Sequence, residues 1–413
     1  MTTRLCAYAL TLALAARALA AFGPPVVVTE LDTGEPGIDV GPDGAIYVNA
    51  PAGLLSSLPG SASFLFRSDD GGATWQLTPP GLRANLPGGG DSDLSIDPGT
   101  GTLYWTDLWL GSATVARSTD RGESWLVNPV QGVVVQDRQW VATAGGGNVY
   151  HVTHQIPLGL VVSKSAAPTD GLVFPLSTVA ATVADQTGCL CPPGTLAAEG
   201  GTGLLGTGDR VGVIYPTSSG GIKFARSTNG ALTFTNVPVS AASSADTTQA
   251  FPVVATAGDG LTLHAVWLEV LAASSRVRYA RSGDWGGSWT VPVTLVSAGT
   301  SIYPWVAARG SKVSVTLYHT DAGGTPSTVA AGSQWFETYL ESTNGGASFS
   351  AATAIDPLPV KSGPICTEGI NCSGNRELLD FQSVTIDAAG RANAAWTRSI
   401  DGVSDTQIRF ARQ

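Results

Sequence analysis

Seven short apolar segments of the chain each begin at an equivalent position, and six of these positions carry a carboxylate or an aromatic ring. We aligned the segments on the glycine-containing turn and the second apolar stretch that follow each one. The leading positions are Glu35, Asp91, Asp137, Pro193, Phe251, Tyr303 and Phe381. Paired carboxylates over aromatic rings are typical of carbohydrate chemistry, in which one carboxyl group protonates the glycosidic oxygen and the other acts on the sugar or on water.

Other charged and aromatic residues stand beside these positions and could complete a site. They are Arg138, Trp140, Arg376, Glu377 and Asp380. If the carboxylates meet, their repulsion would raise at least one pKa or attract a cation such as Ca²⁺ or an arginine. Successive strand residues point in opposite directions, so Arg138 could instead serve the neighbouring segment. Alternatively, the carboxylates accept backbone hydrogen bonds or pair with Arg138. His151 and His154 would point to opposite faces of a strand, and His264 and His319 are isolated, so no histidine metal site is predicted. No cofactor is expected beyond Ca²⁺.

The elements that must position these residues are marked by a repeated phrase, "RSDDGGATW" at 67–75. Its other copies read "RSTDRGESW", "RSTNGALTF", "RSGDWGGSW" and "ESTNGGASF", and the first serines are Ser68, Ser118, Ser227, Ser282 and Ser342. The steps between them are 50, 109, 55 and 60 residues, so one copy has decayed within the longest step, where "SKSAAPTDGLVF" stands at 163–174. Such a period indicates a supersecondary unit repeated in a ring or array.

Each unit reads as four short strands, because its apolar stretches are rich in Val, Ile, Tyr, Trp and Thr and are bounded by Gly, Asp and Pro. Four strands per repeat predict the blades of a β-propeller. The seven first-strand segments predict seven blades, with six as the alternative. The last unit ends at "QIRFARQ" without its outer strand. The spare strand "PPVVVTE" at 24–30 should pair with it and close the ring.

The phrase resembles the Asp-box, or bacterial neuraminidase repeat, of the sialidase superfamily. The resemblance implies that each copy lies in the hairpin between the third and fourth strands of a blade, on the face opposite the usual ligand site. The acidic or amide residue can bond backbone N–H groups within a tight turn, and the closing Trp or Phe can pack between sheets. The structural Asp-box residues are Asp70, Asp120, Asn229, Asp284 and Asn344. The repeats are therefore expected to be scaffold.

The sialidase resemblance also implies a mechanism, with three arginines on the sugar carboxylate, a tyrosine nucleophile paired with a glutamate, and an aspartate as acid/base. Tyr303 with Glu269 is the pair that could take the nucleophile's part. The first-blade arginine is absent, since the matching stretch reads "GEPGIDV", so little or no release of sialic acid is expected. The catalytic candidates are Glu35, Asp91, Asp137, Tyr303, Glu269 and Asp380. The substrate-binding candidates are Arg138, Trp140, Phe251, Arg376 and Phe381.

The composition and the N-terminal residues limit the binding partners and the cellular compartment that we expect for the protein. Only 13% of the 413 residues are charged and the net charge is −10, which argues against nucleic acid and anionic membranes as partners. Residues 1–20 read as a secretory signal peptide with Arg4, an apolar stretch and "ALA" before the cleavage point. We therefore expect a secreted, extracellular or periplasmic protein with no membrane span. Residues 21–413 should form a single domain, and a monomer is expected.

Four cysteines remain after that cleavage, an even number that favours disulfides in an exported chain. Cys366 and Cys372 lie six positions apart in a loop and are expected to pair. Cys189 and Cys191 could bond to each other or cross to the first pair. Both pairs stand in loops that lead into a first strand, on the predicted ligand face.

Two functions are compatible with this pattern. One is a secreted glycoside hydrolase of sialidase-like fold that acts on exposed glycans. The other is a non-catalytic propeller that binds a carbohydrate or a protein at the same face. A pocket holding two facing carboxylates, or Tyr303 against Glu269 with converging arginines, would favour the enzyme. A shallow face whose carboxylates bond the backbone would favour the binding protein.

Overall fold

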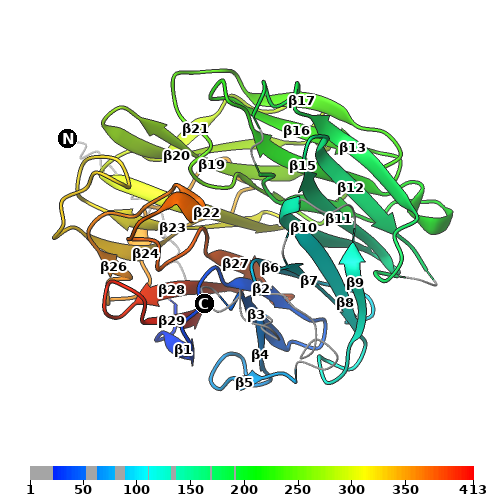
Figure 1. The fold of residues 1–413 in the computed structure, drawn as a ribbon, viewed down its shortest axis with the longest axis horizontal. Helices are drawn as coiled ribbons and strands as arrows, with labels where there is room; N and C mark the ends of the chain where they lie inside the picture. Colours follow the sequence, from blue (N-terminus) through cyan, green and yellow to red (C-terminus); the bar gives the residue numbers. More distant parts are fainter. Residues whose placement is uncertain are drawn as a thin grey trace, which may run out of the picture.

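The computed structural model describes residues 22–52, 63–79, 89–109, 111–131, 136–167, 170–189 and 192–413, which form seven antiparallel sheets around a central axis (Figure 1). The first strands of neighbouring sheets contact one another and line that axis. The prediction of a seven-bladed β-propeller with four-stranded blades is confirmed. The predicted signal peptide, residues 1–20, lies outside the described residues.

Blades 1 to 4 follow the chain in order, each from its innermost to its outermost strand. Blade 1 consists of β2 (Gly37–Val40), β3 (Ile46–Ala50), β4 (Phe64–Ser68) and β5 (Gln76–Leu77). Blade 2 consists of β6 (Ser92–Ile96), β7 (Leu103–Trp109), β8 (Ser112–Ser118) and β9 (Leu126–Gln131). Blade 3 consists of β10 (Gln136–Gly145), β11 (Asn148–Gln155), β12 (Gly159–Ser165) and β13 (Leu176–Thr182). Blade 4 consists of β14 (Leu196–Glu199), β15 (Arg210–Pro216), β16 (Ile222–Ser227) and β17 (Thr235–Ser240), with the 3₁₀ turn η3 (Leu204–Gly206) in its first hairpin.

Blades 5 to 7 complete the ring. Blade 5 consists of β18 (Val253–Thr256), β19 (Leu263–Leu271), β20 (Ser274–Ser282) and β21 (Val293–Val296). Blade 6 consists of β22 (Thr300–Arg309), β23 (Lys312–Thr320), β24 (Gln334–Ser342) and β25 (Thr353–Ala354), and β26 (Lys361–Ser362) also pairs with β24. Blade 7 consists of β27 (Ser383–Ile386), β28 (Ala392–Ser399), β29 (Thr406–Arg412) and β1 (Val26–Thr29), and the 3₁₀ turn η4 (Gly369–Asn371) precedes it.

Blade 7 joins the two ends of the described chain. β1 pairs antiparallel with β29, with Val26 opposite Phe410 and Val27 opposite Arg409. The predicted closure of the ring is therefore confirmed. β1 therefore supplies the outer strand of blade 7 and covers the edge of β29.

The Asp-box copies occupy the hairpins between third and fourth strands, as predicted. In the first copy, Oδ1 of Asp70 accepts hydrogen bonds from the Thr74 amide and the Ser68 hydroxyl, and the hydroxyl oxygen of Ser68 accepts one from the Gly72 amide. The indole N–H of Trp75 donates to the carbonyl of Gly72. These bonds satisfy a turn that would otherwise leave its backbone groups unpaired.

The glycine of the box meets the preceding blade. Gly72 has φ +96°, and a Cβ built on it would lie 2.0 Å from a ring carbon of Phe410 in β29. Gly286, with φ +74°, approaches the ring of Phe224 in β16 in the same way. The box therefore requires glycine both for its left-handed backbone and because the ring of the neighbouring blade fills the space where a side chain would stand.

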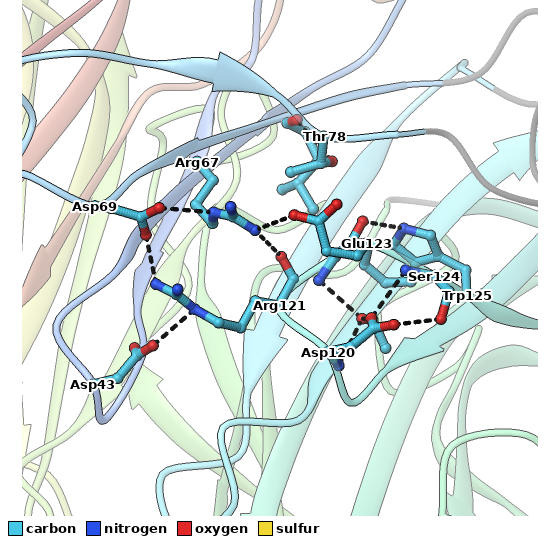
Figure 2. A network of polar contacts seen from close by, with 12 residues as sticks. Asp43, Arg67, Asp69, Thr78, Asp120, Arg121, Glu123, Ser124 and Trp125 are labelled. Atoms are coloured by element: carbon cyan, nitrogen blue, oxygen red, sulfur yellow. Dashed lines mark hydrogen bonds and ion pairs between the residues drawn. The ribbon is translucent and has the colours of Figure 1, made fainter.

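In the four copies that open with arginine, this arginine links the box to the next blade. Nη1 of Arg67 donates to the carbonyl oxygen of Arg121 and pairs with Glu123, both in the hairpin of blade 2 (Figure 2). Arg121 in turn pairs with Asp69 and with Asp43 of blade 1. In later blades, Arg226 donates to the carbonyl of Trp285 and Arg281 to that of Gly345. The nine-residue phrase therefore also joins one blade to the next.

Candidate functional site

The first strands β10 and β22 each begin with a β-bulge, and each bulge contains a residue with a positive φ angle. Arg138 has φ +54° and Tyr303 has φ +52°, values that bulky residues seldom adopt. The register of β10 against β11 shifts between Asp137 and Gln139, and that of β22 against β23 shifts between Ile302 and Trp305. Strained residues of this kind persist where the surrounding structure holds them, and they often occur at functional sites.

Arg138 occupies the centre of the channel mouth and contacts two other blades. Its Nη1 lies 3.4 Å from Oε2 of Glu35 in blade 1 and 3.5 Å from Oδ1 of Asp91 in blade 2. Its Nη2 donates to the carbonyl oxygen of Ser92 at 3.5 Å. The side chains of Arg138 and Glu35 are each 2% exposed, whereas that of Asp91 is 20% exposed. The expectation that an arginine joins the neighbouring carboxylates is met, and the bulge, rather than simple strand alternation, aims it.

Burial and like charge change the protonation of this cluster. Burial raises the pKa of Glu35 well above its usual value, and the nearby Asp91 and Asp380 carboxylates add to the rise. Burial also raises the pKa of Asp91 to about 6, against the lowering effect of the Arg138 guanidinium. Burial and the neighbouring carboxylates therefore favour the protonated form of Glu35, whereas the Arg138 and Arg376 guanidinium groups oppose this shift.

The remaining charged candidates surround this cluster. Asp380 donates its backbone N–H to Oε1 of Glu35 at 3.0 Å, and its own Oδ2 accepts from Nη2 of Arg376 at 2.6 Å. Asp137 is exposed, and its Oδ1 accepts the backbone N–H of Arg138 at 2.7 Å. Asp137 therefore supports the bulge, and its charge also raises the pKa of the neighbouring Asp91.

The aromatic candidates pack against one another instead of forming an open surface. The cluster of Trp140, Trp305, Phe381 and Phe251 is called the plug below. The ring centroids of Trp140, Trp305 and Phe381 lie between 5.2 and 5.8 Å apart, and the Trp140 and Phe251 centroids are 5.6 Å apart. The guanidinium carbon of Arg138 sits 3.8 Å above the Trp140 ring. Trp140 and Phe381 are buried. Trp140 and Phe381, two of the predicted substrate-binding residues, therefore already pack inside the protein.

The predicted pair of Tyr303 and Glu269 does not form. Nε of Arg276 donates to Oε2 of Glu269 at 2.6 Å, and Arg278 lies 3.5 Å from its Oε1. The hydroxyl of Tyr303 is buried and has no hydrogen-bond partner among the described residues. Burial raises the pKa of Tyr303 well above 10, and Asp380 adds to the rise. Tyr303 therefore lacks the base that would make it a nucleophile.

Two further acids lie below the plug, and sequence analysis missed them. Asp39 and Asp93 line a cavity of about 180 Å³ on the propeller axis. Oδ2 of Asp39 accepts the N–H of Ile96, and Oδ2 of Asp93 accepts that of Val141, so each acid ties one first strand to the next. Burial raises their pKa values to about 6 and about 7. The signal in the sequence was an acidic residue inside an apolar strand, in "GIDV" and "SDLSI".

A groove opens beside the channel mouth on the same face. It consists of two adjoining cavities of about 350 and 300 Å³, which share Thr248, Gln249, Thr367 and Glu368. Asp380 and Phe251 line the cavity nearer the axis. The groove has the volume of an ordinary ligand site. Of the candidates proposed from the sequence, the groove therefore includes Phe251, Asp380 and Cys366, and the more distant polar residues were missed because their loops carry no repeat.

A hydrogen bond fixes the two sides of the groove. The hydroxyl of Thr367 donates to Oε1 of Gln249 at 3.0 Å, and Nε2 of Gln249 donates to Oδ2 of Asp246 at 2.9 Å. Gln249 belongs to the loop between blades 4 and 5, whereas Thr367 belongs to the loop before blade 7. The bond therefore holds together loops that lie more than a hundred residues apart in the sequence.

The loop that carries Thr367 is closed by a disulfide between Cys366 and Cys372, whose Cα atoms are 5.9 Å apart. This is the pairing expected from their spacing, and it excludes a crossed pairing with the other two cysteines. Cys189 is also disulfide-bonded, whereas Cys191 lies outside the described residues. The two disulfide-bearing loops flank one cavity, since Pro192 and Gly369 both line the part of the groove near the axis.

The described residues contain no group of three or more His, Cys, Asp or Glu side chains arranged to hold a metal ion. Among the same residues, no helix is long and apolar enough to cross a membrane.

No family model matches the chain, and no curated protein sequence matches it. Solved structures match nearly its full length at low identity. A protein of unknown function from Dyadobacter fermentans has 15% identity and a TM-score of 0.53, over 94% of this chain and 97% of that one. The α-L-arabinanase of Penicillium chrysogenum, solved with arabinobiose, has 11% sequence identity and a TM-score of 0.52, over 95% of this chain and 98% of that one. YCF48 from Cyanidioschyzon merolae has 13% identity and a TM-score of 0.51, over 94% of this chain and 98% of that one. The chain thus resembles Asp-box propellers, and the likeness shows its fold.

Proposed function

We propose that the protein is exported and acts as a non-catalytic carbohydrate-binding propeller whose site is the groove beside the channel mouth. One observation carries this proposal: two adjoining cavities form the groove on this face, whereas the acids and rings at the channel mouth bond to or pack against one another. The fold alone does not decide, because solved propellers of this shape include both an arabinanase with arabinobiose and YCF48 bound to a peptide.

The channel-mouth acids are poorly placed for hydrolysis. A glycosidase needs a protonated carboxyl group and an ionised one on either side of the scissile bond, with space for the sugar between them. Here the Arg138 guanidinium lies between Glu35 and Asp91, and the Glu35 side chain is fully buried. Substrate could approach only if the ion pair broke, which would leave charges buried without partners.

The groove suits a sugar because its polar groups are hydroxyls, amides and carboxyls. Such groups donate and accept hydrogen bonds in the geometry that sugar hydroxyls require. The half-buried Phe251 ring in the wall offers one apolar surface, and Pro252 and Pro192 lie beside it. A few convergent polar groups against an apolar wall are typical of small-ligand sites.

A sialidase-like glycoside hydrolase is the second candidate. The observation that favours it is the pair of partly exposed acids, Asp91 and Asp380, near Glu35, whose pKa burial raises. This candidate requires hydrolysis of a glycan that Asp91→Asn abolishes.

A glycan array with purified protein tests the proposal, using Thr248→Trp to fill both cavities. Thr248 is exposed and lines both, so the larger ring blocks the groove without entering the core. The matched control is Leu204→Trp, at a residue that is 88% exposed in a hairpin on the opposite face. We expect the wild type and Leu204→Trp to bind the same glycans and Thr248→Trp to lose them. Glycan binding that survives Thr248→Trp, or no binding by the folded wild type, contradicts the proposal.

A further inference from the structure

The groove carries an excess of negative charge. Asp246, Glu368 and Asp380 line it, and none of the described residues that line either cavity is Lys, Arg or His. Among the described residues, the cation that pairs with this set is Arg376, whose Nη2 contacts Oδ2 of Asp380. Three carboxylates against one guanidinium leave two uncompensated negative charges when all are ionised. A concave site with charge of one sign concentrates ligands of the opposite sign.

Two of the three carboxylates are held by the loops that form the groove. Burial opposes ionisation of Asp246, but hydrogen bonds from the Thr248 amide and hydroxyl and from Gln249 outweigh it and lower the pKa. The backbone of Asp246 is fixed by a bridge to Val270 in the same blade. Asp380 is fixed through its N–H to Glu35. The negative charge is therefore positioned before a ligand arrives, which reduces the cost of ordering the site on binding.

From this geometry we propose that the ligand is a cationic glycan, an oligosaccharide whose sugar rings carry free amino groups. This inference rests on the proposed function and specifies its ligand class. Ammonium groups would donate charge-assisted hydrogen bonds to the carboxylates, and ring hydroxyls would pair with the amide and hydroxyl groups of Gln249, Thr367 and Asn375. Glycans with carboxylate or sulfate groups would meet like charge and be rejected.

The walls favour a sugar over a lysine-rich peptide as the source of the ammonium group. The apolar wall is short, with Phe251 as its ring, and the polar groups are spread along both cavities. A sugar ring presents an apolar face and several hydroxyls together, whereas a lysine side chain presents one donor on a flexible stem. The peptide is therefore an outcome that the experiment distinguishes.

Calorimetry at pH 5.5 tests the inference with three probes: a chitosan hexamer, its fully N-acetylated counterpart and a lysine hexapeptide. We expect the chitosan hexamer to bind wild-type protein about tenfold more tightly than the neutral hexamer. Raising the salt concentration should weaken the chitosan hexamer alone, because screening acts on charge pairs. The lysine hexapeptide should bind more weakly than the chitosan hexamer, since it lacks the ring hydroxyls.

Glu368→Gln is the variant that probes the charge directly, since Glu368 is exposed and Gln keeps its shape. We expect a three- to fivefold loss of affinity for the chitosan hexamer and no change for the neutral one. The matched control is Glu123→Gln, which removes one carboxylate from the opposite face and keeps a bond to Arg67.

Equal affinity for the two hexamers, or equal effects of Glu368→Gln and Glu123→Gln, would overturn the cationic ligand while the carbohydrate site stands. A lysine hexapeptide that binds as tightly as the chitosan hexamer would also overturn it, because the site would then recognise charge without the sugar. If neither hexamer responds to Thr248→Trp, the proposed function itself fails, and the two failures are thereby separated.

Discussion

Arg138 of blade 3 and Glu35 of blade 1 form an ion pair at the channel mouth, with Nη1 of the arginine 3.4 Å from Oε2 of the glutamate and both side chains almost fully buried. Asp91 of blade 2 approaches the same nitrogen. One guanidinium therefore joins three blades that are far apart in the sequence. Because both side chains are buried, we expect the pair to contribute to the stability of the protein rather than to contact a ligand.

Arg138→Ala should destabilise the protein by about 3–5 kcal/mol at pH 7, because it leaves the buried acids without their cation. The loss should shrink toward pH 5, since burial raises the pKa of Asp91 to about 6 and also raises that of Glu35, so that less negative charge is then left without a partner. Urea unfolding at the two pH values measures this. The double variant Arg138→Met with Glu35→Gln should recover much of the stability, and an equal loss at both pH values would contradict the argument.

Asp93→Asn should change how stability depends on pH. Burial raises the folded-state pKa of Asp93 to about 7 from 3.8. Its stabilising contribution is therefore fully present below pH 4 and disappears as the pH rises through about 7. We expect the variant to match the wild type near pH 4 and to exceed its unfolding free energy at pH 8. The amide oxygen of Asn can still accept the Val141 N–H.

Unfolding free energies from pH 4 to pH 8 test this prediction. Asp69→Asn serves as the matched control, because this carboxylate is 45% exposed on the opposite face. The same pH profile for Asp93→Asn and the wild type would show that Asp93 is ionised in the folded protein throughout.

Gly72→Ala should cost about 3 kcal/mol or more. The backbone there has φ +96°, and the new Cβ would lie 2.0 Å from the Phe410 ring across the blade interface. Gly145→Ala is the matched comparison, since it also has a positive φ of +84° but no atom within 4 Å of the added Cβ. It should cost only about 1 kcal/mol. Thermal or urea unfolding compares them, and similar losses would show that strain alone, without the ring contact, selects glycine.

The repeats made the fold predictable, whereas the site depended on details that repeats do not encode. The Asp-box resemblance placed the repeated phrase in the hairpins, and the missing outer strand of the last unit predicted that "PPVVVTE" pairs with "QIRFARQ". The leading position of each first strand correctly brought Glu35 and Asp91 to one mouth. The direction of the Arg138 side chain depends on a bulge in which this residue has a positive φ. The sequence does not predict this bulge, because arginine does not favour the left-handed backbone conformation.

The groove could not be predicted from the sequence, for a different reason. Its walls come from two unrelated loops, and the Thr367–Gln249 bond that joins them spans 118 positions. The cysteine spacing predicted that the loop at 366–372 is closed, but no pattern in the sequence indicated that it meets the loop of Gln249. Trp140 and Phe381 were correctly placed around the axis, but they pack against each other, since facing rings in a narrow channel fill it.

Sialyl substrates should be neither bound nor cleaved. A sialic acid carboxylate needs a free guanidinium, but Arg138 is paired with Glu35 and stacked on Trp140, and Arg376 is paired with Asp380. The phenol of Tyr303 stays neutral, because burial raises its pKa well above 10. Incubation with a fluorogenic sialoside and titration with sialyllactose measure both properties, and Tyr303→Phe should leave both unchanged. Release of sialic acid that Tyr303→Phe abolishes would mean that the channel mouth opens in solution and that this tyrosine reaches substrate.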